Sequence, residues 1–172
     1  FKDFAIFYRT NAQSRVLEEQ LNALTIPYKL VGGMRFYERM EIKDMISYLK
    51  LILNPNDDMA FSRVINVPVR GIGKKTNEKI ETLATEKKLT LFEASLYAID
   101  TQAFNSGTTK KVKVFTDLIE SLQRENQNAS PLEAYLSVLD KTHYIEFLKN
   151  QDSFEAQSRI ENLDELNNAI DQ

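Results

Sequence analysis

The residues best suited to chemistry stand next to one another between two segments of helical periodicity. They are Arg70, Gly71, Ile72, Gly73, Lys74, Lys75 and Thr76. The two glycines allow a tight turn and a close backbone approach to a ligand, and the isoleucine between them can pack onto the core. The arginine and the lysines supply positive charge where the next helix would present its first amides, an arrangement that suits phosphate.

Positive charge is concentrated around this stretch. Residues 63–88 contain seven Lys or Arg and three Glu, whereas the whole chain has 22 Lys or Arg, 25 Asp or Glu and a net charge of −3. The acidic total excludes a uniformly basic nucleic-acid coat protein but leaves room for a local basic patch. The local pattern favours a helix-hairpin-helix that grips a nucleic-acid backbone over a plain turn with solvated lysines.

A second candidate site follows a short apolar run at residues 4–8. Arg9 and Asn11 stand at the carboxyl end of this predicted strand and open a helix, which is where α/β folds bind ligands. They suit phosphate or base edges, but the same spacing suits a helix cap with a solvated arginine. The spacing alone favours neither interpretation.

A third candidate is the glycine turn at Gly32 and Gly33, which basic and aromatic residues follow. Arg35 with Phe36 and Tyr37 is a mix that can track a single nucleic-acid strand. We favour a domain hinge with the two aromatic side chains in the core.

Other chemistries find little support. Cysteine is absent and His143 is the single histidine, so thiolate and multi-histidine metal sites are excluded. Asp57 and Asp58 fit a helix cap better than a metal site, and we predict no metal site. No phosphate-binding Gly-x-x-x-x-Gly-Lys-Ser/Thr motif is present. No apolar run approaches the ~18–20 residues that cross a bilayer, so we expect no membrane contact.

The elements that position these residues change in type along the chain. Residues 4–8 and 28–31 are expected as parallel strands around a helix that begins with a capping box at Thr10 and Gln13 and carries Glu18 and Glu19 on its outer face. Beyond residue 33 the pattern is helical throughout, with a loop expected at residues 105–109. We therefore predict a mainly α chain in which a βαβ slice precedes an all-helical domain.

Four segments resemble one family in order and spacing. They are residues 4–19, 31–44, 66–73 and 157–165, and they are similar to motifs of the UvrD/PcrA/Rep superfamily 1 DNA helicases. The resemblance implies that residues 1–33 are part of a RecA-like domain 2A and that residues 34–172 are most of domain 2B. The chain begins with Phe1, which agrees with an excerpt.

The resemblance also implies functions. The parent would be an ATP-dependent, 3′-to-5′ DNA helicase of repair or replication, using ATP and Mg²⁺ in the cytoplasm on bacterial nucleoid DNA. This fragment would hold no cofactor and would not be catalytic alone. The hairpin would hold duplex DNA, Arg9, Asn11 and Arg35 would contact the single strand, and Gly32 with Gly33 would serve the hinge. An alternative is a protein-interaction or self-association module.

Overall fold

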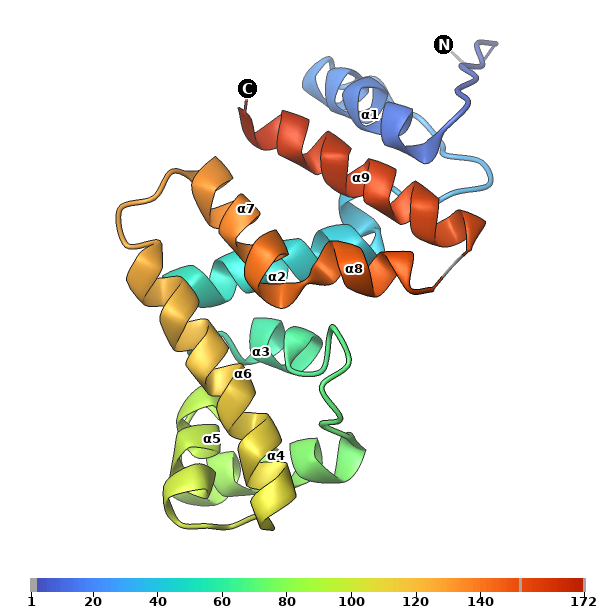
Figure 1. Ribbon diagram of the computed structural model, residues 1–172. Helices are drawn as coiled ribbons and strands as arrows, with labels where there is room; N and C mark the ends of the chain where they lie inside the picture. Colours follow the sequence, from blue (N-terminus) through green and yellow to red (C-terminus); the bar gives the residue numbers. More distant parts are fainter. Residues whose placement is uncertain (1–2, 152, 172) are drawn as a thin grey trace. The chain divides into compact units, whose positions relative to one another are not determined.

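A computed structural model describes residues 3–151 and 153–171 (Figure 1). Within these residues the chain is mainly helical, and no β-strand is present. None of the described helices is both long and apolar enough to cross a membrane. The elements are η1 (Asn11–Gln13), α1 (Ser14–Ala23), η2 (Phe36–Glu38), α2 (Met40–Leu53), α3 (Asp58–Val64), α4 (Lys74–Lys87), α5 (Leu91–Asp100), α6 (Ser106–Glu125), α7 (Pro131–Thr142), α8 (Tyr144–Lys149) and α9 (Phe154–Asp171).

The predicted βαβ slice is not supported. Residues 4–8 and 28–31 have irregular backbone on either side of α1, and neither segment has a strand beside it among the described residues. A parallel strand exists through its ladder of hydrogen bonds to neighbours, and a two-stranded unit is too small to hold one. Apolar composition alone therefore does not make these segments strands.

The helix starts agree better with expectation, because capping is local. Ser130 and Glu133 form a capping box ahead of α7, with Pro131 as its first residue. Asp57 accepts a hydrogen bond from the Ala60 amide at 2.9 Å and so caps α3. The loop expected at residues 105–109 is wrong: Asn105 caps α6, and the residues after it form the first turn of that helix.

The chain forms two compact units. One comprises residues 1–43 and 145–172, and the other comprises residues 44–144, with boundaries inside α2 and α8. We call them the terminal unit and the central unit. The predicted domains, residues 1–33 and 34–172, concern the longer parent and stay a prediction.

The central unit has an apolar core. Helices α4, α5 and α6 pack together, with α3 against α5 and α7 against α6 (Figure 1). The rings of Phe61 and Phe115 meet edge to face with centroids 5.3 Å apart, and Phe61 meets Phe92 in the same way at 6.5 Å. Such pairs add to the stabilisation that burial gives. This core fixes the ends of the helices that carry the hairpin residues.

The terminal unit buries polar side chains of α1 beside apolar ones such as Phe36 and Leu163. In α1 the buried residues are Ser14, Arg15 and Glu18, while Val16 and Leu24 are exposed. The expectation that Glu18 faces outward is therefore wrong, since its carboxylate accepts hydrogen bonds from the Phe36 amide and the Tyr28 hydroxyl. The helix turns its polar side toward η2 and α9 because their donors and acceptors satisfy it.

Candidate nucleic-acid interface

The predicted phosphate-binding residues lie in the connection between α3 and α4. We call residues 66–73 the hairpin loop. Asn66 organises it: its Oδ1 accepts hydrogen bonds from the amides of Arg70 at 2.8 Å and Ile72 at 3.0 Å. One short side chain thus fixes two amides four and six residues later, which bends the loop back on itself.

The side chain of Arg70 is directed inward. Its Nη1 lies within 3.0–3.3 Å of the carbonyl oxygens of Val64, Ile65, Val67 and Pro68. Its Nη2 donates to the Tyr48 hydroxyl at 2.7 Å, and its Cζ lies 5.3 Å from the centroid of the Phe115 ring. The guanidinium fork therefore satisfies carbonyls at the end of α3 and of the hairpin loop.

Tyr48 is the buried partner of this arginine. It lies on α2 inside the central unit, and its hydroxyl also contacts the Val67 carbonyl. Burial raises the pKa of Tyr48 to about 12, although the nearby Arg70 opposes the shift. The phenol is thus neutral at physiological pH and serves as both donor and acceptor beneath the loop.

The turn itself has the conformation that the two glycines suggested. Gly71 has a φ of +73°, in the left-handed region where a side chain is strained. Ile72 is 1% exposed and anchors the loop in the core, as the sequence predicted. Gly73 is the N-cap of α4 and has no side chain to satisfy the first amides of that helix.

The lysines that follow are at the surface. Lys74 and Lys75 are exposed in the first turn of α4, and Thr76 beside them is half-buried. The Nζ of Lys74 lies 3.7 Å from the Glu78 carboxylate one turn later, a surface pair that solvent weakens. Their charges and the uncapped amides of α4 therefore lie together at the end of the hairpin loop.

Lys111 is a neighbour of the hairpin loop that the sequence did not single out. It comes from α6, and its Nζ donates to the Gly71 carbonyl at 3.3 Å. A Cβ added at Gly71 would lie 2.8 Å from this Nζ. Local patterns did not identify Lys111, Tyr48 or Asn66 as residues that contact the turn. The sequence does show that residues 101–116 contain no Asp or Glu.

The predicted single-strand residues all belong to the terminal unit. Arg9 is exposed, and its amide donates to Gln13 Oε1 at 2.9 Å, beside the Thr10 amide that donates to the same oxygen at 3.3 Å in the predicted capping box. Asn11 is also exposed and lies 3.5 Å from the Ser158 hydroxyl. Both line a hollow of about 1340 Å³. Arg35 is not among the lining residues, and its Cζ lies 5.8 Å from the centroid of the Tyr28 ring.

The glycines of the predicted hinge are exposed. Gly32 has a φ of +78° and lines the same hollow, and a Cβ on Gly33 would lie 3.2 Å from Leu30 Cδ2. Phe36 is buried as expected, whereas Tyr37 is exposed and donates to Glu19 at 2.8 Å. The structure thus places a turn with a left-handed glycine where the hinge was predicted, and the hinge role stays a prediction.

A buried arginine organises the residues around Asn11. Arg39 Nη1 donates to the Asn11 carbonyl at 2.8 Å and to Asn162 Oδ1 at 2.7 Å, and its Nη2 donates to the Ser14 hydroxyl at 2.8 Å. Burial lowers the pKa of Arg39, and the Glu18 and Glu41 carboxylates oppose that shift. The guanidinium therefore ties η1 and the start of α1 to α9.

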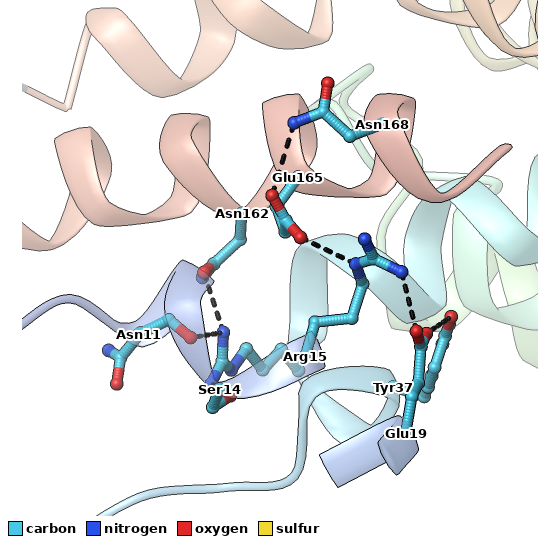
Figure 2. A network of polar contacts seen from close by, with 9 residues as sticks. Asn11, Ser14, Arg15, Glu19, Tyr37, Asn162, Glu165 and Asn168 are labelled. Carbon is cyan, nitrogen blue, oxygen red and sulfur yellow. Dashed lines mark hydrogen bonds and ion pairs between the residues drawn. The ribbon is translucent and has the colours of Figure 1, made fainter. Parts of the chain in front are cut away.

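A second arginine continues this network along α1. Arg15 Nε lies 2.7 Å from Glu165, and its Nη1 lies 2.7 Å from Glu19 (Figure 2). The hydrogen bonds to both carboxylates raise the pKa of Arg15, although burial acts against them. Arg39 thus holds the Asn11 backbone in place, and Arg15 extends the polar network along α1. The amide side chain of Asn11 is exposed.

The described part of the chain contains no group of side chains suited to bind a metal ion. No three His, Cys, Asp or Glu side chains gather there as a ligand group. The observed geometry instead offers lysines and backbone amides, which are ligands for anions.

A family model and individual relatives point to the same family of proteins. A family model described as the UvrD-like helicase C-terminal domain matches residues 1–172. The chain is 44% identical over 166 residues to the ATP-dependent DNA helicase PcrA of Staphylococcus epidermidis (strain ATCC 35984), covering 96% of this chain and 23% of that protein. It is 45% identical over 164 residues to the PcrA of Bacillus subtilis (strain 168), covering 95% and 22%. The chain thus spans less than a quarter of the length of these curated relatives.

Proposed function

The chain belongs to the UvrD-like helicase C-terminal domain family, and we propose that it is the duplex-binding accessory region of an ATP-dependent DNA helicase. Its relatives carry the name ATP-dependent DNA helicase. In this proposal the hairpin loop and the start of α4 form a helix-hairpin-helix that holds the DNA backbone without reading sequence. The parent works on DNA repair or replication in the cytoplasm.

The observation that carries the proposal is the opposite direction of the side chains in the hairpin loop and at the start of α4. Arg70 and Ile72 are turned inward, whereas Gly73, Lys74 and Lys75 are exposed. The uncapped amides of α4 and the two ammonium groups can then contact phosphates of the same DNA backbone. We therefore assign phosphate contact to residues 71 and 73–76, and we assign Arg70 the role of holding the loop in shape.

ATP and Mg²⁺ are cofactors of the proposed parent. The residues of this chain do not fit them, since the sequence has no phosphate-binding loop and the described residues include no group of three or more His, Cys, Asp or Glu that could hold a metal ion. We therefore assign no step of ATP hydrolysis to these residues. Arg9, Asn11 and Arg35 remain the proposed single-strand contacts, and Gly32 with Gly33 the proposed hinge.

The test is a fluorescence titration of a labelled DNA duplex with the purified chain at two salt concentrations. We expect a dissociation constant on the order of 10⁻⁴–10⁻⁶ M that weakens as salt rises. The double variant Lys74→Met/Lys75→Met should reduce the slope of log K against log salt by about two, because each lost phosphate contact removes about 0.9.

The control is Lys87→Met/Lys88→Met, which removes the same charge from the other end of α4, roughly 20 Å away at 1.5 Å per residue. Equal effects of the two double variants would contradict the hairpin assignment. Absence of binding at low salt would favour the protein-interaction or self-association module instead.

A further inference from the structure

We propose that Lys110 and Lys111, near the start of α6, bind phosphates of the same duplex as the hairpin loop. This inference rests on the proposed function and extends the DNA-binding surface to a second helix. The two residues are called the α6 lysine pair below. Both are exposed, and they lie about 40 positions after the hairpin loop in sequence.

The first support is contact. Lys111 crosses from α6 to the turn of the hairpin loop, where one of its three ammonium donors bonds the Gly71 carbonyl at 3.3 Å. Its Nζ is so close to Gly71 that a Cβ there would lie at 2.8 Å. A phosphate that approaches the turn at Gly71 therefore meets the Lys111 charge as well.

The second support is the distribution of charge. Residues 59–77 and 101–116 contain seven Lys or Arg and no Asp or Glu, in a chain of net charge −3. The Lys111–Gly71 contact brings these two carboxylate-free stretches together on the central unit. Exposed carboxylates would repel a polyanion, so two adjoining stretches without them favour a nucleic-acid backbone over a basic partner.

The third support is the contrast with other lysines of the same unit. Lys113, two positions later on α6, pairs with Asp117 at 3.0 Å. Lys79 is directed to the Ala103 carbonyl and the Phe104 ring, and Lys87 to the Tyr97 ring. These side chains have partners away from the hairpin loop, whereas Lys111 points its ammonium at the loop.

The experiment titrates the labelled duplex with the Lys110→Met/Lys111→Met chain over a range of salt concentrations. Methionine keeps much of the side-chain length and removes the charge. We expect binding roughly 2- to 30-fold weaker at low salt, the range that two exposed charge contacts give. The slope of log K against log salt should also fall by about two.

The slope separates phosphate contact from a purely structural role. If Lys111 only holds the turn in place, the variant weakens binding at every salt concentration with an unchanged slope, and the inference is overturned. The single variant Lys110→Met guards against loop distortion, because it should lower the slope by about one without touching the Lys111–Gly71 bond. An unchanged slope in that variant also overturns the inference.

Controls separate the two proposals. If Lys74→Met/Lys75→Met weakens binding and the α6 variant behaves like Lys87→Met/Lys88→Met, the inference fails while the proposed function stands. If the α6 variant alone lowers the slope, the α6 lysine pair is supported and the hairpin assignment fails. Displacement of the duplex by polyglutamate at equal charge concentration would point to an acidic protein and overturn the DNA assignment.

Discussion

The two units of this chain differ in how much charge they bury. The central unit buries aromatic and aliphatic side chains, with Phe115 and Phe61 fully enclosed. The terminal unit buries the charged side chains of Arg15, Glu18 and Arg39 and leaves Phe4 and Phe7 exposed at 81% and 92%. Burying a charge is costly unless it is paired and hydrogen-bonded, so the terminal unit depends on the completeness of its polar network.

The same difference separates the two candidate DNA sites. Around the hairpin loop an apolar core sets the helices, and the half-buried Arg70 shapes the turn. Around Asn11 the backbone is held by Arg39 and Asn162, and an apolar hollow lies in front. We therefore expect apolar truncation to damage the first site and polar substitution to damage the second.

The largest effect is expected from Phe115→Ala in the central unit. The change leaves a cavity beside Phe61 and removes the ring beneath the Arg70 guanidinium. Truncation of a buried Phe lowers the free energy of unfolding by about 3–5 kcal/mol. Hydrogen exchange of the central unit measures this loss, and Val114→Ala, at a neighbouring position that is 57% exposed, should stay within about 0.5 kcal/mol.

A comparable but smaller loss is expected from Arg39→Met in the terminal unit. Methionine fills much of the volume but leaves the Asn11 carbonyl, the Asn162 amide oxygen and the Ser14 hydroxyl without their donor. A buried acceptor left unsatisfied costs about 1–3 kcal/mol, so we expect a loss of about 3 kcal/mol. Exchange should accelerate in α1 and α9 and stay unchanged in α5. The exposed neighbour Arg35→Met is the control, and an effect as large from Arg35 would contradict the polar-network account.

The sequence could predict features that depend on neighbouring residues and could not predict those that depend on distant ones. The caps at Ser130 and Asp57 were predictable because the donor, the acceptor and the cap lie within three residues. The burial of Glu18 was not, because its acceptor role depends on Phe36, 18 residues away. The apolar residues next to Glu18 form a helical stripe along α1, and this stripe indicated that the face opposite Glu18 would be buried.

The hairpin shows the same limit within a site. The turn at Gly71, the anchor at Ile72 and the exposed lysines were predicted from adjacent residues. The inward direction of Arg70 was not, because its partner Tyr48 lies 22 positions earlier on another helix. An arginine beside lysines looks like part of a basic patch until the carbonyls around it are placed.

Alkaline pH should weaken the central unit through Tyr48. Its pKa is about 12 in the folded chain against an ordinary value of 10, so the unfolded chain ionises first. The stabilisation from the neutral phenol is present below pH 10 and is lost as pH rises through about 12. The loss is roughly 2–3 kcal/mol.

Urea denaturation at pH 8 and pH 11.5 measures this effect. The variant Tyr48→Phe should be less stable at pH 8, because Arg70 loses an acceptor, but its stability should fall less between the two pH values. Lysine titration affects both proteins equally, so the difference isolates Tyr48. Parallel pH curves would show that Tyr48 ionises as easily in the folded state as in the unfolded one.

The smallest effect on stability is expected from Phe7→Ser in the terminal unit. Phe7 is 92% exposed and lines the apolar hollow, so the free energy of unfolding should change by no more than about 0.5 kcal/mol. Binding of an apolar fluorescent dye should fall, because an exposed apolar surface is what such a dye detects. The same aromatic residue type would then be essential at position 115 and dispensable for folding at position 7. A loss of several kcal/mol from Phe7→Ser would instead mean that the ring is buried in solution and that the apolar core of the terminal unit extends to residue 7.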